Sequence, residues 1–214
     1  MLDNKVYSKM FTWLFVGLMI TFISGYCLSL NYTLLYNILS IGIIPIIIVE
    51  FAIAILMGAR IQKMKPLTAK ICYIIYSITT GITFASIFLA YQMSSIIFVF
   101  LVTAVVFAIC AILGYTTKLD LTKFGVILFI ALLASIIVSL LNIFVFKSTQ
   151  VELWLSIILV VVFLGYTAYD MHIVKYLMNS IGEEKAAIYG AFQLYLDFIN
   201  IFIRLLQLLG KSRD

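Results

Sequence analysis

Long apolar runs separated by short polar connections occupy almost the whole chain. Seven of these runs are long enough to cross a membrane, since a membrane-spanning helix needs about 20 predominantly apolar residues. They cover residues 11–30, 34–59, 67–91, 94–115, 124–146, 153 to about 178, and 186–209. The pattern predicts an all-α polytopic membrane protein with seven transmembrane helices, organised as a single domain over residues 1–214.

The composition supports this interpretation and excludes a water-soluble globular protein. Of the 214 residues, 65% are hydrophobic and 11% are charged, whereas soluble domains have roughly 45–50% and about 25%. The seven runs and their short connections use nearly the whole length. No separate extramembrane domain is therefore expected.

The first run allows a second interpretation, because it follows Lys5 and Lys9 as the apolar part of a secretory signal peptide does. Residues 24–31 lack a clean small-residue cleavage site, and six more runs follow. A retained transmembrane helix is therefore favoured.

The cysteines do not suggest a disulfide framework. Cys27, Cys72 and Cys110 lie in three separate apolar runs, and their number is odd. We expect them to be buried as small hydrophobic side chains.

The basic residues lie at the ends of the runs and divide unequally between the two sides of the membrane. If the N-terminus is inside, ten of the 14 Lys and Arg face the cytoplasm, while Lys147, Arg204, Lys211 and Arg213 face the other side. This bias predicts a cytoplasmic N-terminus. The net charge of +5 forms no basic stripe, so no nucleic-acid partner is expected. The basic C-terminus leaves one alternative open, a re-entrant last segment.

Proline and capping residues refine the boundaries of the runs. Pro66 is expected at the first position of the third helix, where its missing N–H costs nothing. Pro45 is expected to kink the second helix near Gly42. Ser180 and Glu183 have the spacing of a capping box before the last helix.

Ionisable side chains inside the runs are the candidates for function, because each is costly in lipid. In the last run, Gln193, Asp197, Asn200 and Arg204 follow one another at spacings of four, three and four, which places them on one helical face. Such a stripe must face protein or water, so the last helix is expected at the centre of the bundle. Gln193 and Asn200 are also explained by interhelical hydrogen bonding alone, and Arg204 by snorkelling to the interface.

Asp197 and Asp170 are expected to form a carboxylate pair. Asp197 lies near the middle of the membrane, and the short connection of residues 179–184 makes the last two helices neighbours. Two carboxylates at one poorly hydrated site do not easily ionise together, so one is expected to keep its proton. The pair should titrate as a unit, sense protons and attract a cation when ionised.

Two further charged residues lie within reach of this site. Glu50 is placed near the middle of the membrane, where it can line a path together with Asp197. Arg60, at the cytoplasmic end of the second run, can reach toward Asp170 or serve as an ordinary interfacial anchor. Three carboxylates with Asn200 and Gln193 offer calcium a loose set of oxygen ligands, which suits a path that ions leave again.

An enzymatic function is not expected. His172 is the only histidine and no cysteine pair has zinc spacing, which excludes a zinc protease. A Ser-His dyad would have to use this same histidine.

Several motifs resemble the Bax inhibitor-1, or transmembrane Bax inhibitor motif, family. Gly165, Tyr166, Tyr169 and Asp170 are similar to its sixth-helix signature. The run of residues 194–202, followed by Leu205 and Leu206, is similar to its most recognisable segment, and Gly81, Ile82 and Thr83 also fit. The chain looks like a compact bacterial member.

The resemblance implies a seven-helix fold with the last helix inside a cage of six, and a pH-sensitive calcium leak. It implies that Asp170 and Asp197 are the paired aspartates, Arg60 the latch and Glu50 the mid-membrane acid. Calcium is then the transported ion, held transiently at Asp170 and Asp197, and no cofactor is expected. The expected partners are the lipid bilayer, calcium ions and protons.

Three functions stay open at this point. The leading hypothesis is a calcium-permeable leak in a bacterial cytoplasmic membrane, gated by the aspartate pair. A proton-coupled calcium or cation antiporter would use the same carboxylates. A scaffold that regulates a stress or cell-death response would conduct nothing and act through protein partners that the sequence does not identify.

Overall fold

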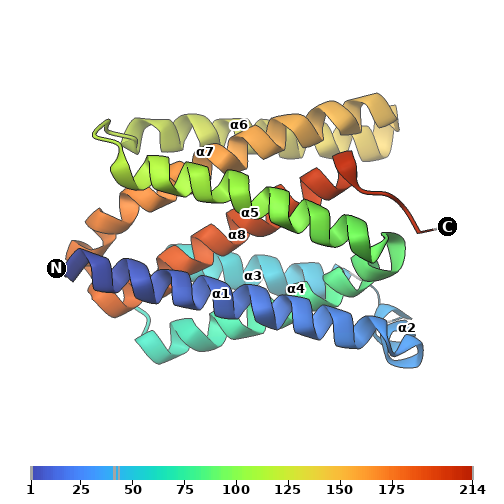
Figure 1. The fold of residues 1–214 in the computed structure, drawn as a ribbon, viewed down its shortest axis with the longest axis horizontal. Helices are drawn as coiled ribbons and strands as arrows, with labels where there is room; N and C mark the ends of the chain where they lie inside the picture. The colour runs from blue at the N-terminus through green and yellow to red at the C-terminus, as the bar shows by residue number, and fades with distance from the viewer. Residues whose placement is uncertain (1, 41, 43, 214) are drawn as a thin grey trace. The chain divides into compact units, whose positions relative to one another are not determined.

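The computed structural model describes residues 2–40, 42 and 44–213, and the chain is helical almost throughout (Figure 1). The helices are α1 (Leu2–Ser29), α2 (Tyr32–Ser40), α3 (Ile44–Arg60), α4 (Pro66–Ala90), α5 (Met93–Thr116), α6 (Thr122–Leu141), α7 (Thr149–Ile181) and α8 (Glu183–Leu209). A single π-helical turn, η1 (Asn142–Phe146), extends α6. The predicted all-α class is confirmed.

Six segments of the described chain are long and apolar enough to cross a membrane, where the sequence predicted seven. They are α1, α4, α5, α6 with η1, α7 and α8. The exception is the second predicted run, which is divided into α2 and α3. The 17 residues of α3 span only about 25 Å, somewhat less than the roughly 30 Å of a bilayer core.

The division of the second run corrects the expectation of a kinked helix. Gly42 has a φ of +100°, a left-handed conformation that glycine adopts without strain. Pro45 follows in the first turn of α3, where it lacks the N–H that a continuous helix would need. The two residues together interrupt the helix. Gly42 takes a backbone conformation that is not helical, and Pro45 has no N–H to donate to the preceding turn.

The start of α4 agrees with the sequence prediction, whereas the turn between α7 and α8 does not. Pro66 opens α4 at its first position, as predicted. The capping box is wrong, because Ser180 belongs to α7 and its Oγ donates to the carbonyl of Leu177 at 3.1 Å. The turn is made instead by Gly182, whose φ of +82° ends α7 in the left-handed conformation that favours glycine.

The chain forms two compact units that share α7 and α8. Unit 1 comprises Met1–Gln92, Val174–Tyr195 and Ser212–Asp214; unit 2 comprises Met93–Ile173 and Leu196–Lys211. In unit 1, α1 packs extensively against α4. A Cβ on Gly25 would lie 2.8 Å from the carbonyl oxygen of Gly81, and one on Gly81 would overlap Ser24 Oγ. The two glycines therefore let the helices approach closely, as small residues do in membranes.

Unit 2 contains a second close approach, between α5 and α7. A Cβ on Gly114 would lie 2.7 Å from the backbone carbonyl carbon of Ala168. This contact positions the α7 segment that carries Tyr169 and Asp170 along the axis of α5.

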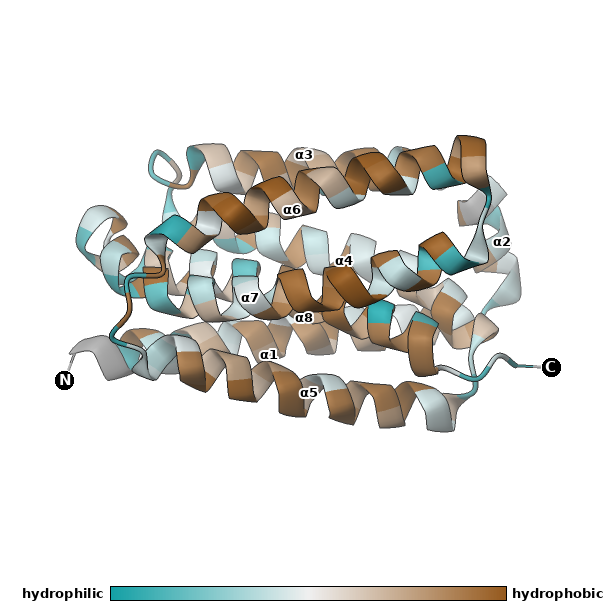
Figure 2. Cartoon of the chain, turned by 90° about the horizontal axis from the view of Figure 1, so that it is seen from above, coloured by the Kyte–Doolittle hydropathy of each residue, from teal (hydrophilic) through white to brown (hydrophobic). Residues whose placement is uncertain are grey.

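The surfaces of the helices match an apolar solvent. Figure 2 shows hydrophobic residues along most of α5, and its exposed side chains include Phe98, Leu101 and Val105. Only 6% of the most apolar stretch in the α6 span is buried, against 72% in α8. Large exposed apolar faces are typical of lipid-facing helices, whereas α8 is covered by protein. Cys27 belongs to the exposed surface, so its predicted burial is wrong, while Cys72 and Cys110 are half-buried.

Candidate functional site

The structure brings Asp170 and Asp197 together in unit 2. Asp170 lies in α7 and Asp197 in α8, with 7% and 4% of their surfaces exposed. The carboxyl groups are close enough for one to hydrogen-bond the other. An ionised carboxylate can only accept hydrogen bonds, so a hydrogen bond between the two would require a proton on one of them.

One hydroxyl group and one unpartnered oxygen characterise the surroundings of the pair. The hydroxyl of Thr167, one turn before Asp170 in α7, lies near Asp197 and donates its hydrogen to the carbonyl of Phe163 at 2.9 Å. In the described part of the chain, Asp197 Oδ2 is buried without a hydrogen-bond partner. Buried polar atoms normally have one. A proton held between the carboxyl groups would satisfy this oxygen.

Aromatic rings surround the same segment of α8. The ring of Phe198 packs edge-on against Phe100 and Phe107 of α5, with centroids 5.3 and 5.4 Å apart. Tyr166 and Tyr169 of α7 lie close enough to Asp170 to interact with its charge. Water is thus largely excluded, which makes a second negative charge in the pair costly.

Glu50 occupies a different setting, in unit 1. It is half-buried on α3, and Thr83 Oγ1 of α4 donates to its Oε1 over a long 3.5 Å. The hydroxyl of Thr80 lies beside the same carboxylate. That hydroxyl is buried without a partner of good geometry among the described residues. One carboxylate and two hydroxyls thus form a cluster of oxygen ligands, which we call the Glu50 cluster.

The hydroxyls of the Glu50 cluster belong to a longer stripe that the sequence analysis missed. Positions 73, 76, 77, 80 and 83 of α4 carry tyrosine, serine or threonine at spacings of three, one, three and three, which is one helical face. Within unit 1, Thr21 Oγ1 donates to the carbonyl of Ser77 at 2.9 Å and bonds the Tyr195 hydroxyl. The helical spacing of these uncharged hydroxyl residues is the sequence signal that could have predicted the stripe.

The predicted polar stripe of α8 is present but divided in role. Gln193 is half-buried in unit 1. Asn200 donates to the carbonyl of Leu196 in its own helix at 2.8 Å. Arg204 Nη1 donates to Gln207 Oε1 at 3.0 Å. Asn200 and Arg204 are therefore engaged mainly with neighbouring residues of the same helix.

Arg60 is the last residue of α3, and its side chain is exposed. It belongs to unit 1, whereas Asp170 belongs to unit 2. Its role as a latch stays a prediction, as does the binding of calcium at Asp170 and Asp197. In the described ranges, no group of three or more His, Cys, Asp or Glu side chains is arranged to hold a metal ion.

The six apolar spans and the buried polar residues between them define a multi-pass α-helical membrane protein. The chain belongs to the family described as inhibitor of apoptosis-promoting Bax1, whose model matches residues 3–214. The resemblance to the Bax inhibitor-1 family is thereby confirmed.

Two relatives illustrate how far this similarity extends. The chain is 37% identical over 216 residues to the inner membrane protein YbhL of Escherichia coli K12, covering 96% of this chain and 91% of that protein. It is 35% identical over 221 residues to an uncharacterized protein of Borreliella burgdorferi, covering 100% and 95%. Both alignments thus extend over nearly the whole chain.

Proposed function

We propose that the protein is a pH-sensitive, calcium-permeable leak of a bacterial cytoplasmic membrane, with Asp170 and Asp197 as its sensor and gate. The observation that carries this proposal is the buried carboxyl pair on two adjacent helices. Calcium is the transported ion, and the activity needs no cofactor. The name of the relative YbhL, an inner membrane protein, supports the assignment of the membrane.

The sign of the pH response follows from competition for Asp170. While the pair shares a proton, Asp170 is held by Asp197 and the gate is released. When the proton leaves, two negative charges repel each other, and Asp170 is free to pair with Arg60 at the end of α3. That bridge favours the closed state, so the leak falls as the pH rises.

The Glu50 cluster supports a path for the ion. Its carboxylate attracts a cation, and the hydroxyls of Thr80 and Thr83 can turn their lone pairs toward it. Gln193 and Asn200 add amide oxygens along α8. Calcium prefers six to eight oxygen ligands, so this sparse set holds the ion weakly enough for it to leave.

The proposal includes a topology of seven crossings, in which α2 and α3 together supply the second crossing and α8 is the last, inside a cage of the other six. The charge bias places the N-terminus in the cytoplasm. Single cysteines at Lys63 and Lys118, in a background without other cysteines, should react only from the cytoplasmic side. A cysteine at Gln92 should react only from outside, and its labelling from the cytoplasm would overturn this topology.

The decisive experiment measures calcium flux into proteoliposomes while the lumenal pH is recorded. Wild-type protein should carry calcium down its gradient, with flux that falls as the pH is raised. Asp170→Asn and Asp197→Asn should remove this pH response. Asp120→Asn is the matched control, because its exposed carboxylate lies between α5 and α6, where the Thr122 hydroxyl and N–H keep its pKa below the usual value.

The same recording separates the alternative functions. A proton-coupled antiporter would move protons in fixed proportion to calcium, and the lumenal pH would follow the flux. A scaffold would give no calcium flux at all. Either result would contradict the proposed leak.

A further inference from the structure

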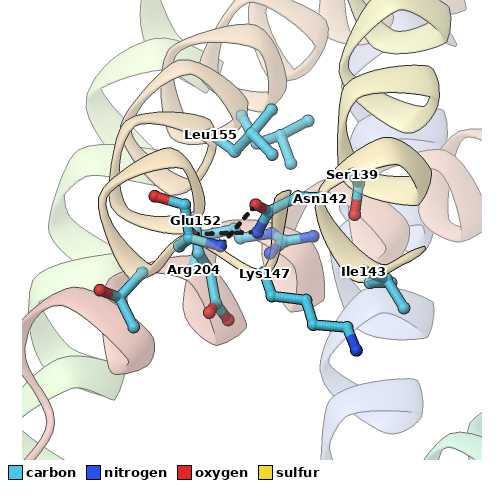
Figure 3. Close-up of a pocket in the computed structure, with 10 residues that line it drawn as sticks. Ser139, Asn142, Ile143, Lys147, Glu152, Leu155 and Arg204 are labelled. Carbon is cyan, nitrogen blue, oxygen red and sulfur yellow. Dashed lines mark hydrogen bonds between the residues drawn. The ribbon is translucent and has the colours of Figure 1, made fainter. Parts of the chain in front are cut away.

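Unit 2 contains a cavity of about 390 Å³ that the proposed leak does not use (Figure 3). It lies where the end of α6, the turn η1, the start of α7 and the last third of α8 meet. The polar lining includes Asn142, Lys147, Ser148, Glu152 and Arg204, and Leu155 and Leu159 add apolar surface. The cavity is therefore amphipathic.

The cationic groups of this cavity have unused binding capacity. Arg204 uses one nitrogen, Nη1, for Gln207, and a guanidinium has five N–H donors. Among the residues that the structure describes, neither Arg204 nor Lys147 forms a salt bridge. Both belong to the four basic residues that the charge pattern assigns to the non-cytoplasmic side. Half of that side's cations thus line a single cavity.

The backbone at the cavity is irregular in a way that positions Lys147. This residue has a φ of +49°, the one positive φ among the described residues that are not glycine. Asn142 holds the turn, because its Nδ2 donates to the carbonyl of Ser148 at 3.1 Å and its Oδ1 accepts from the Ser148 N–H at 3.0 Å. A left-handed lysine costs about 1–2 kcal/mol. Conformations of this kind cluster at ligand sites.

The surface around the cavity is apolar. Ile143, Phe144 and Phe146 of η1 expose 60%, 75% and 59% of their surfaces. Leu155 and Leu159, inside the cavity, are nearly fully buried. A ligand that places a charged group in the cavity can therefore lay an apolar part along the adjacent helices.

We propose that this cavity binds the phosphate headgroup of a membrane lipid, with Arg204 and Lys147 as its cationic contacts. Guanidinium and ammonium groups are the side chains that bind phosphate oxygens best. Glu152 adds one negative charge to the lining, which favours a headgroup that carries an ammonium beside its phosphate. Phosphatidylethanolamine has this charge pattern, and phosphatidylglycerol lacks the ammonium.

The test is native mass spectrometry of delipidated protein in detergent, titrated with phosphatidylethanolamine, phosphatidylglycerol or diacylglycerol. The first lipid should bind most tightly and diacylglycerol least. Arg204→Gln should weaken phosphatidylethanolamine binding by about tenfold, since a charged hydrogen bond contributes on this scale. Lys211→Gln is the matched control, because it removes an exposed charge just beyond the end of α8 from a residue that does not line the cavity.

A second variant separates binding from folding. Lys147→Gly removes the cation and also relieves the left-handed strain, so it should raise the melting temperature without lipid and still bind the lipid severalfold more weakly. Lys147→Arg should retain binding. If Lys147→Gly and Arg204→Gln both bind phosphatidylethanolamine like the wild type, the site is refuted.

A competition experiment with inorganic phosphate distinguishes a lipid phosphate from free phosphate as the ligand of the cavity. At millimolar concentration it should displace little of the bound lipid, because it lacks the apolar part that lies along η1. Complete displacement, or a melting-temperature increase with inorganic phosphate equal to that with lipid, would overturn the assignment to a lipid.

Discussion

Two carboxylate sites in this molecule accommodate negative charge away from water in different ways. Asp170 and Asp197 are almost completely buried, and each has the other carboxyl group as a close partner. Glu50 is half-buried and faces the hydroxyls of Thr80 and Thr83. The first site can limit its charge to −1 only by holding a proton, whereas the second surrounds its charge with neutral oxygens.

The difference separates sensing from attraction. A pair that shares a proton changes its charge when the pH changes. A single carboxylate beside hydroxyls has no second carboxyl group with which to share a proton. Variants at the two sites should therefore affect different properties of the leak, namely its pH dependence and its rate.

The largest effect is expected for Asp197→Asn. The asparagine amide does not ionise, so Asp170 has no second carboxyl group with which to share a proton. The control of the gate by that proton is then lost. Wild-type flux should change by up to about tenfold per pH unit near the transition, the limit for one linked proton, and flux through the variant should change by less than about twofold. Proteoliposome calcium flux between pH 6 and 8 measures this. Identical profiles for the variant and the wild type would remove Asp197 from the sensor.

Glu50→Gln should have the next largest effect, on rate alone. It removes the negative charge with little change in shape, and the lost attraction of about 1 kcal/mol corresponds to roughly fivefold lower flux. The midpoint of the pH response should not move. A shifted midpoint would show that the two carboxylate sites are not separate in function.

Arg60→Ala should raise the leak severalfold at the high-pH end, where the wild type is most closed. The pH response should be reduced but not abolished, because the aspartate pair remains. Flux must be normalised to inserted protein, since an interfacial anchor would instead lower insertion and leave the normalised flux unchanged. That second pattern would refute the latch.

Thr83→Val should have the smallest effect, less than about twofold in flux. Its hydrogen bond to Glu50 is 3.5 Å long, near the limit for such a bond. Thr79→Val, one turn earlier in α4, is the matched control, because Thr79 is also half-buried but its hydroxyl donates to carbonyl groups of its own helix. A loss as large as that of Glu50→Gln would show that the hydroxyl, rather than the charge, determines the rate.

The sequence predicted the helices well where hydropathy alone decides their extent. It failed over residues 34–59, because hydropathy does not reflect backbone conformation. Gly42 leaves the helical conformation, and Pro45 cannot donate the N–H that would continue the helix across this point. The capping box failed for a similar reason, since the backbone freedom of Gly182 outweighed a favourable side-chain spacing.

The candidate site was predictable to the extent that charge marks it. Asp170 and Asp197 could be paired because a short turn makes their helices neighbours. The hydroxyl stripe of α4 was overlooked because Tyr, Ser and Thr are common in apolar runs and carry no charge. The cavity beside Lys147 could not be predicted, because it depends on the π-helical turn η1, which has no sequence periodicity.

The close packing of α1 and α4 has a mechanical consequence. Besides the contact at Gly25 and Gly81, the Tyr73 hydroxyl of α4 donates to the carbonyl of Trp13 in α1 at 3.1 Å, and Thr21 donates to Ser77. These two hydrogen bonds and the close contact of the glycines oppose sliding or rotation of the two helices past each other. The two helices therefore act as one rigid pair, so in the proposed leak any gating displacement must be carried by other helices.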